Sequence, residues 1–209
     1  MAPRELQALL GGTDIYLIDQ ILRGNIAPGM KIFDAGCGGG RNLAYLLRAG
    51  FEVAGIDSQP GAIAAIRELA ASLAPSLPPK AFRCESLESH TFADAAFDVV
   101  ISSAVLHFAR DEEHFLAMLE GSWRPLRPGG LFFCRLASTI GMEERHQPLG
   151  GRRFQLPDGS RRFLVDQAYL LELTDQLGGG LVDPLKTTVV QDQRCMTTWV
   201  LRRALSAAP

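Results

Sequence analysis

The stretch FDAGCGGGRN, residues 33–42, contains four glycines in ten residues and directly follows a short, mostly apolar run at residues 30–33. Glycine at this density indicates a backbone that turns tightly or approaches another group closely, because glycine has no Cβ atom. Leu43, Leu46 and Leu47 then recur at helical spacing. The stretch therefore predicts a strand, a glycine loop and a helix, and the N-terminus of such a helix presents unpaired N–H groups to a ligand.

Strands and helices alternate on both sides of this unit. The run DVVIS, residues 98–102, is rich in β-branched side chains and is typical of a strand buried on both faces of a parallel sheet. We expect strands at residues 30–33, 51–56, 81–84, 98–102, 131–136, 181–190 and 195–201, and helices that start near Pro60, Asp111 and Asp166. The predicted fold class is α/β, a doubly wound, seven-stranded, Rossmann-like sheet with helices on both faces and an antiparallel terminal hairpin.

The length of 209 residues fits one domain, residues 1–209. Apolar residues at helical spacing predict an N-terminal helical cap over residues 1–25. The pattern loosens over residues 138–166, where Pro157, Asp158 and Gly159 form a turn signal. We predict that this segment is an inserted hairpin, which acts as a lid over the ligand site.

The composition, 47% hydrophobic and 21% charged residues with a net charge of −2, is that of an ordinary globular protein. Such a charge gives no reason to expect nucleic acid as a partner. The longest uncharged apolar run, residues 99–109, is 11 residues long, whereas a membrane span needs about 20. The start lacks a signal-peptide pattern. We therefore expect a cytoplasmic monomer or homodimer that binds no membrane.

The four cysteines are isolated from one another and form no CxxC pair. They are predicted to be reduced core thiols, with no disulfide and no metal site. These residues are Cys37, Cys84, Cys134 and Cys195. The spacing of His90, His114 and His146 is not that of metal ligands either, and we expect these three histidines at the surface.

Asp57 ends the second predicted strand, 21 positions after Gly36. An acid at this place accepts hydrogen bonds from both hydroxyls of a ribose, although an isolated Asp there could also cap the next helix. The dinucleotide fingerprint G-x-G-x-x-G/A fails because its third glycine position, counted from Gly36, is Arg41. No P-loop pattern is present. An adenosine ligand without a pyrophosphate fits better, and a nicotinamide oxidoreductase is disfavoured.

Four motifs occur in a familiar order: DAGCGGG at residues 34–40, GID at 55–57, FDVVISSAVLHF at 97–108 and LRPGGLFF at 126–133. Together they resemble the motifs of class I S-adenosylmethionine-dependent methyltransferases, and more narrowly the small bacterial type 11/12 methyltransferases. The resemblance covers about residues 28–137. It implies the cofactor S-adenosyl-L-methionine, the product S-adenosyl-L-homocysteine, and methyl transfer to O, N or S of an unidentified small molecule.

The resemblance also implies which residues contact the cofactor. Asp34 would stabilise the loop and bind the cofactor's ammonium group. Asp57 would bind the ribose, and Ser58 would lie beside the adenine. At the adenine edge two alignments compete: Glu85 supplies the acid, or Ser86 takes its place and Leu87 supplies a backbone N–H. The implied cofactor-binding residues are Tyr16, Asp34, Ala35, Gly36, Cys37, Gly38, Arg41, Asp57, Ser58, Glu85, Ser86, Leu87, Ser102 and Ser103.

The acceptor side is less clearly marked. His107 follows the fourth predicted strand at its C-terminal end, where it would act as a catalytic base or, alternatively, finish a turn by bonding backbone. Tyr16 either lies over the cofactor or belongs to the core. Five arginines in residues 138–166 favour an anionic acceptor, and their alternative is a solvated loop. We expect Tyr16, His107, Arg152 and Arg153 to bind the substrate.

In-line methyl displacement needs an aligned nucleophile more than strong acid–base help, so the substrate cannot be derived from the core motifs. The N-P-P-Y-type signature of adenine and glutamine N-methylation is absent, since Ser103, Ala104, Val105 and Leu106 occupy its place. A second hypothesis is a non-catalytic module that binds S-adenosylmethionine or S-adenosylhomocysteine. Turnover with an acceptor distinguishes the two hypotheses.

Overall fold

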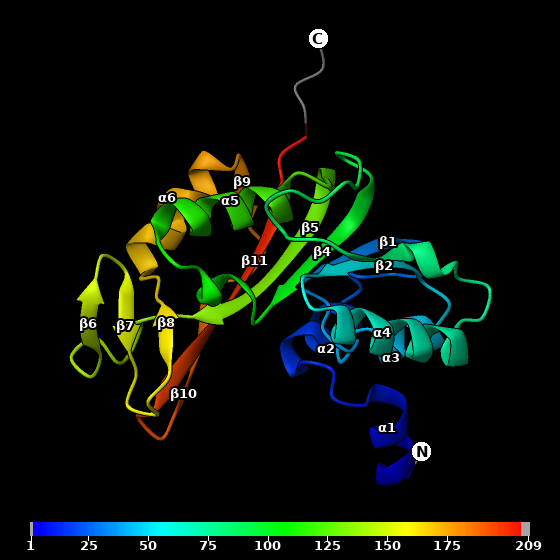
Figure 1. Cartoon of the computed structure of the whole chain (residues 1–209), viewed down its shortest axis with the longest axis horizontal. Coiled ribbons are helices and arrows are strands. Elements are labelled where there is room, and N and C mark those ends of the chain that lie inside the picture. Colours follow the sequence, from blue (N-terminus) through cyan, green and yellow to red (C-terminus); the bar gives the residue numbers. More distant parts are fainter. Residues whose placement is uncertain (1, 206–209) are drawn as a thin grey trace.

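The structure is a computed structural model that describes residues 2–205. Its central element is a mixed sheet of strand order β10-β11-β5-β4-β1-β2-β3, with β9 pairing to β11 beside this path (Figure 1). The strands are β1 Lys31–Ala35, β2 Glu52–Asp57, β3 Phe82–Cys84, β4 Phe97–Ser103, β5 Leu126–Ala137, β9 Gly179–Leu181, β10 Lys186–Val190 and β11 Arg194–Arg203. Strands β1 to β5 pair in parallel, and β11 is antiparallel to β5 and β10. The predicted α/β, doubly wound architecture with an antiparallel hairpin is confirmed.

The prediction of one strand over residues 181–190 was wrong, because two short strands, β9 and β10, cover this region. Pro184 lies between them and has no backbone N–H for a ladder. Beside it, the buried Asp183 carboxylate accepts hydrogen bonds from Gln20 Nε2 at 2.8 Å and Arg23 Nη1 at 2.6 Å. The chain therefore turns away from the sheet here, and the sheet has eight strands.

Helices cover both faces of the sheet (Figure 1). Adjacent residues of a strand point to opposite faces, so Ile32 packs in the layer of α3 and α4 while Phe33 packs in the layer of α5 and α6. Both side chains are fully buried, as are Val99 and Val100 of β4. The helices are α1 Pro3–Leu10, α2 Ile15–Leu22, α3 Ala44–Arg48, α4 Pro60–Leu73, α5 Glu112–Trp123 and α6 Gln167–Gln176, with the short 3₁₀ helices η1 Pro79–Ala81 and η2 Leu106–Phe108.

A second, three-stranded antiparallel sheet lies at one end of the molecule (Figure 1). It consists of β6 Gln147–Gly150, β7 Arg153–Gln155 and β8 Arg161–Phe163, so the segment predicted as a hairpin has one strand more than expected. Phe163 anchors this small sheet on α5, where its ring stacks on Phe115 with 4.6 Å between the ring centroids.

Helix α5 lies unusually close to the segment that follows β3. A Cβ atom on Gly121 would lie 2.0 Å from the carbonyl oxygen of Leu87, so only glycine permits this approach. Across the same contact, His90 Nε2 bonds the Gly121 carbonyl oxygen at 2.8 Å. His90 is 4% exposed and lies against the ring of Phe33. The expectation that His90 lies at the surface was therefore wrong.

His146 is also buried, packing against Phe154, whereas His114 is half-buried. Among the cysteines, Cys84 is exposed and not a core thiol, while the other three are buried as expected.

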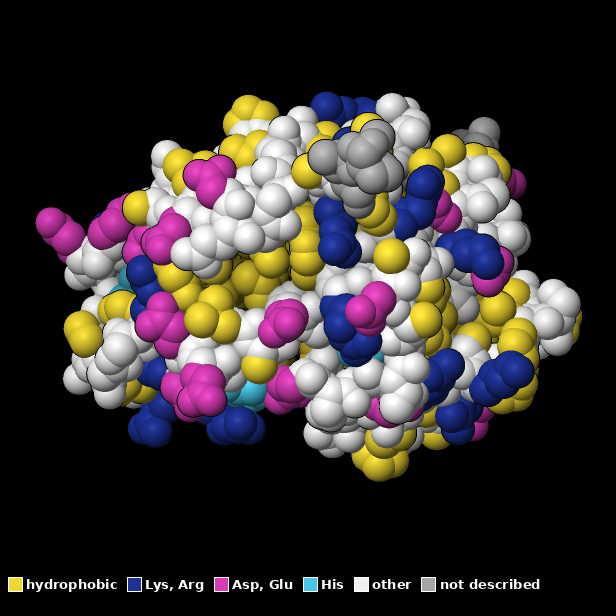
Figure 2. Space-filling view, turned by 90° about the horizontal axis from the view of Figure 1, so that it is seen from above, with side chains coloured by type: hydrophobic (Ala, Val, Ile, Leu, Met, Phe, Trp, Pro, Cys, Tyr) yellow, Lys and Arg dark blue, Asp and Glu magenta, His cyan; other side chains and the backbone are white. Residues whose placement is uncertain are grey.

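In the described chain, no helix is long and apolar enough to cross a membrane. Figure 2 looks onto the face that carries α5 and α6 and shows hydrophobic side chains in a hollow of this face, with acidic and basic side chains scattered around it.

The close approach of α5 generates a stability prediction. Gly121→Ala should lower the free energy of unfolding by about 1–3 kcal/mol, because a methyl group has to displace backbone rather than a flexible side chain. Gly61→Ala in α4 is the matched control, since a Cβ atom there meets nothing within 4 Å. Urea denaturation of both variants measures the difference, and equal stabilities would contradict the packing described.

Candidate functional site

The glycine loop after β1 turns back beneath the end of β2. The N–H groups of Gly36 and Cys37 both donate to the carbonyl oxygen of Ile56, at 3.0 and 2.8 Å. Gly36 has a φ of 92° and a Cβ atom there would lie 2.5 Å from Val105. At Gly38, where φ is 51°, a Cβ atom would meet nothing within 4 Å. The first glycine is thus required by packing, while the second leaves open space beside the backbone.

Asp57 connects three elements at the end of β2. One carboxylate oxygen, Oδ2, accepts the N–H of Gly38 at 2.9 Å, and the other, Oδ1, accepts the N–H of Gln59 at 2.9 Å. Gln59 is the N-cap residue of α4. A single side chain therefore holds the glycine loop, the end of β2 and the start of α4 in place, and each oxygen keeps a lone pair for a ligand.

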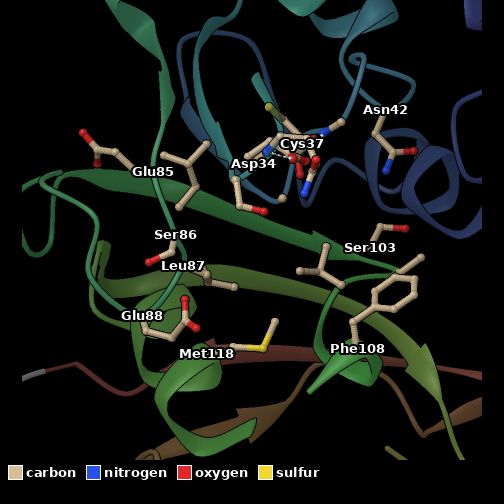
Figure 3. A pocket seen from close by; sticks show the side chains of 18 of the residues that line it. Asp34, Cys37, Asn42, Glu85, Ser86, Leu87, Glu88, Ser103, Phe108 and Met118 are labelled. Carbon is tan, nitrogen blue, oxygen red and sulfur yellow. Dashed lines mark hydrogen bonds between the residues drawn. The ribbon is translucent and has the colours of Figure 1, made fainter. Parts of the chain in front are cut away.

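A cavity of about 860 Å³ lies at the carboxyl ends of β1, β2 and β4 (Figure 3). Figure 3 shows side chains that enter it from the glycine loop, the segment after β3, η2 and α5. Most of the site residues expected from the sequence line this cavity. These are Asp34, Gly36, Cys37, Gly38, Arg41, Asp57, Ser58, Glu85, Ser86, Leu87 and Ser103.

Asp34 is the buried acid of the cavity, with 2% of its surface exposed. Burial raises the pKa of its carboxyl to about 7, Arg41 lowers this pKa, and Asp57 raises it. Among the residues that the structure describes, no group hydrogen-bonds to this carboxyl. A buried carboxyl without a partner favours the binding of a positively charged ligand, because the cation would stabilise the ionised carboxylate.

Arg41 lies at the rim of the same cavity. Its Nη1 donates to the carbonyl oxygen of Gly12 at 3.1 Å, and its Nη2 lies 3.5 Å from Ser103 Oγ. The neighbouring Asn42 accepts the N–H of Asp14 at 3.0 Å. The N-terminal segment is thereby attached to the glycine loop, and the guanidinium keeps donors that face the cavity.

The segment after β3 forms the opposite wall. The carboxylate of Glu85 accepts the N–H and the Oγ1–H of Thr91, at 2.7 and 2.8 Å, and points away from the cavity centre (Figure 3). Ser86 Oγ lies 2.8 Å from Ser89 Oγ. Which of the two competing alignments holds at the adenine edge stays a prediction, but the Glu85 side chain is already occupied by Thr91.

Cys37 lines the cavity without the environment of a nucleophile. Its side chain is buried, and burial raises the pKa of its thiol above the usual range. The negative charges of Asp34 and Asp57 act in the same direction. A neutral thiol is a poor nucleophile, so Cys37 fills space between the loop and β2.

Three of the predicted cofactor contacts do not line the larger cavity. Tyr16 Oη lies 2.6 Å from Thr188 Oγ1, and its ring faces the guanidinium of Arg135 at 5.4 Å. Ala35 and Ser102 are fully buried in β1 and β4. These three residues therefore do not form the wall of the larger cavity.

The arginines predicted to bind the substrate form contacts with other parts of the protein. Arg152 forms an ion pair with Asp166 at 2.7 Å and lies over the ring of Tyr169 at 3.9 Å. Arg153 donates to the carbonyl oxygens of Ala109 and Arg110 at 3.1 and 3.2 Å. Both side chains hold the small sheet against its neighbours, and neither lines the larger cavity or the second cavity described below.

His107 lies beside a second cavity, of about 270 Å³. Its Nδ1 accepts the N–H of Ala137 at 3.1 Å, and burial, with a smaller contribution from Arg162, lowers its pKa to about 4. The ring is therefore neutral at pH 7 with its proton on Nε2, which makes it a hydrogen-bond donor. Its role as a catalytic base stays a prediction, which this tautomer does not favour, because the lone pair of Nδ1 is already used by the Ala137 N–H.

Several lining residues of the larger cavity were not predicted. Asn42 and Phe108 are the last residues of stretches that were used, and Glu88 directly follows Leu87, whereas His114 and Met118 enter from α5. His114 Nε2 lies 2.5 Å from Glu88 Oε1, which joins α5 to the segment after β3. Only the position of α5 brings His114 and Met118 to the cavity, and no local sequence signal marks these two residues.

Comparison with known proteins places this geometry in context. Residues 33–134 match a family model described as a methyltransferase domain of type 11. The chain is 31% identical over 107 residues to an uncharacterised methyltransferase of Synechocystis sp., covering 51% of this chain and 47% of that protein. It is 34% identical over 112 residues to a ubiquinone biosynthesis O-methyltransferase of Methylobacterium sp., covering 54% and 41%. The chain thus spans less than half the length of these curated relatives.

One solved structure, of an S-adenosylmethionine-dependent methyltransferase from Methanosarcina mazei, superimposes with a TM-score of 0.70 at 20% identity. The superposition covers 89% of this chain and 98% of that one. At this identity the likeness shows that the two chains share a fold.

The raised pKa of Asp34 generates a prediction for the free protein. The unfolded chain ionises this carboxyl near its ordinary pKa of 3.8, while the folded chain does so near 7, so the folded state is destabilised progressively as pH rises from about 4 to 7. Asp34→Asn should therefore be more stable than the parent by at least about 1 kcal/mol at pH 8. At pH 4 the two proteins should differ little, and urea denaturation at both pH values measures this. A stability difference that is the same at both pH values would refute the assignment.

Proposed function

Because residues 33–134 belong to the type 11 methyltransferase family, we propose that this protein transfers a methyl group from S-adenosyl-L-methionine to a small-molecule acceptor. The observation that carries the proposal is the larger cavity itself. The open glycine backbone, the Asp57 carboxylate at the end of β2 and the buried Asp34 carboxyl all line this one space. Its volume of about 860 Å³ lies within the usual range for cofactor sites.

The position of the cavity supports this function. In the sheet order β5-β4-β1-β2-β3 the direction of winding reverses between β1 and β4. Open α/β sheets bind their ligands at the carboxyl ends of the strands beside this reversal. Gly36 and Ser103, which follow β1 and end β4, both line the cavity.

The adenosine part fits the side of the cavity near β2. Asp57 already accepts one N–H group on each carboxylate oxygen and has further lone pairs for the two ribose hydroxyls. Ser58 continues the same wall, and Ser86 and Leu87 form the opposite edge, where the adenine would lie. The open space at Gly38 lets the ligand approach the backbone without meeting a Cβ atom.

The methionine part fits the side near β1 and β4. Asp34 is the partner for the cofactor's ammonium group, since its carboxyl has no partner among the described residues. Arg41 offers its guanidinium to the carboxylate from the rim. When bound, S-adenosyl-L-methionine supplies an electrophilic methyl group on a sulfonium. The protein's task is then to hold the acceptor in line with it and to keep water out.

The proposal also includes the roles of two covering segments, the location of the protein and its oligomeric state. We assign residues 138–166 as the lid and residues 1–25 as the N-terminal cap of one methyltransferase domain. Covering segments of this kind, connected to strand ends, commonly exclude water from such sites. The protein would work in the cytoplasm as a monomer or homodimer and act on a small molecule rather than on nucleic acid.

The alternative is a non-catalytic module that binds the cofactor. Both hypotheses need the same glycine loop and the same Asp57, so binding alone does not separate them. The separating measurement is formation of S-adenosyl-L-homocysteine in the presence of candidate acceptors with O, N or S nucleophiles. Product that forms only with an acceptor supports the enzyme, and binding without turnover across all three nucleophile classes supports the module.

The proposed function predicts which cofactor the protein binds. Calorimetric titration should detect binding of S-adenosyl-L-homocysteine and of S-adenosyl-L-methionine, but none of NAD. The reason is that Arg41 stands where a dinucleotide site needs a third glycine. Binding of NAD together with no response to either adenosyl ligand would overturn the proposed function.

The second prediction concerns Asp57. Asp57→Asn should weaken S-adenosyl-L-homocysteine binding about 10- to 150-fold, since hydrogen bonds to a charged group contribute about 1.5–3 kcal/mol. Asp175→Asn is the matched control, because it removes an equal charge from an exposed position on α6. Circular dichroism checks that both variants are folded. Equal affinities of the two variants would show that the ribose is held elsewhere.

A further inference from the structure

The smaller cavity adjoins the larger one. Both have Ala104 in their walls, directly after β4. Ala104 has a φ of 64°, and its N–H donates to the carbonyl oxygen of Arg135 at 2.7 Å, so the chain turns sharply between the two spaces. The smaller cavity extends from this turn toward β5, the start of β11 and the turn between β7 and β8.

Positive charge dominates its wall. Three arginines from three different strands line it, Arg135 of β5, Arg162 of β8 and Arg194 of β11, against one acid, Asp158. Asp158 is already engaged, because its Oδ1 accepts the N–H and the Oγ–H of Ser160 at 2.9 and 2.6 Å. The cavity therefore carries an excess of cations that its own acid does not neutralise.

The donors of these arginines are incompletely used. Arg135 pairs with Asp14 at 2.9 Å, yet its Nε is buried and has no hydrogen-bond partner among the described residues. Arg162 donates from Nη1 to its neighbour's carbonyl oxygen at 2.8 Å and lies over the ring of Phe108 at 4.8 Å. None of the ion pairs within residues 2–205 includes Arg162 or Arg194.

The rest of the wall suits a small organic ligand. Ala137, Leu156 and Met196 supply apolar surface. His107 also lines the cavity, and because its Nδ1 is occupied by the Ala137 N–H, a neutral ring presents Nε2–H as a further donor. An apolar wall with several donors and a single acid is complementary to a molecule that carries an anionic group.

We propose that the smaller cavity binds the methyl acceptor, and that this acceptor carries a carboxylate or phosphate group held by Arg162 and Arg194. The planar guanidinium matches both anions with two parallel hydrogen bonds. The volume of about 270 Å³ limits the bound part to roughly one ring with its anionic group. Because Ala104 lies in the walls of both cavities, the bound acceptor would lie directly beside the cofactor site. The inference rests on the proposed function, and it assigns acceptor binding to arginines other than Arg152 and Arg153.

The test uses matched pairs of acids and neutral analogues. Benzoate, salicylate and phenyl phosphate are compared with benzamide, salicylamide and phenol, by thermal unfolding and calorimetry with and without S-adenosyl-L-homocysteine. At ten times the dissociation constant, an anion that binds should raise the melting temperature by about 3–6 °C, whereas the neutral partners should not. Whether carboxylates or the phosphate bind more tightly identifies the anion.

Variants then locate the site. Arg162→Met and Arg194→Met should each weaken anion binding at least about 10-fold, since a charge-assisted hydrogen bond is lost. Arg161→Met is the matched control, because it removes the same charge from the adjacent exposed position of β8. The affinity for S-adenosyl-L-homocysteine should be unchanged in all three variants, which shows that they are folded.

The outcomes are distinct. Equal shifts from acids and amides, no shift from any acid, or an equal loss in Arg161→Met would overturn the inference. If S-adenosyl-L-homocysteine binds but the acids do not, only this inference fails. If the acids bind with the expected arginine dependence but no adenosyl ligand does, the proposed function fails while the anion site stands.

Discussion

Strands β1 and β4 are covered on both faces, so their backbone polar groups can be satisfied only by neighbouring strands. Side chains such as Ile32 and Phe33 alternate between two apolar layers, and neither face is available to water. A ligand can therefore reach these strands only at their ends. The polar residues of the site follow from this constraint, because Asp34 and Ser103 lie at the ends of strands whose middle parts are entirely apolar.

The glycine loop turns this strand end into a ligand site, and it does so at the expense of stability. Gly36 and Gly38 have left-handed backbone conformations, and an unfolded glycine chain has more freedom to lose than any other. Asp34 adds a buried carboxyl whose ionisation is unfavourable in the free protein. Asp57 compensates in part through two backbone hydrogen bonds. The entropic cost of the loop and the cost of the buried carboxyl are therefore concentrated in the same few residues, and a cationic ligand would stabilise the ionised carboxyl.

Features that depend on local spacing were predictable from the sequence. The glycine loop and Asp57 could be brought together because each follows a recognisable strand, and parallel strands end at a common edge. The start of α5 was predictable too, since Asp111 caps the helix by accepting the N–H of His114 at 2.8 Å. The break between β9 and β10 also has a local signal, because Pro184 has no backbone N–H for a strand ladder.

Features that depend on tertiary packing were not predictable. Met118 and His114 reach the larger cavity only because Gly121 lets α5 approach the segment after β3. The choice among the arginines depends on strand register, since successive residues of a strand point to opposite faces. Arg153 pairs across from Phe163 and turns toward the backbone of residues 109 and 110, whereas Arg162 faces the smaller cavity. A sequence pattern does not give that register.

The contact between Asp14 and Arg135 links two distant parts of the chain across the smaller cavity's wall. Asp14 is almost fully buried, caps α2 by accepting the N–H of Tyr16 at 3.0 Å, and receives Arg135 Nη1 at 2.9 Å. The electrostatic potential inside the smaller cavity is thus set partly by the N-cap of an N-terminal helix that contributes no residue to its lining. A relative with a neutral residue at this position would have a more positive cavity with an unchanged wall. The charge preference of this cavity would then differ between relatives through the N-terminal segment alone, while the residues that line the cavity stay the same.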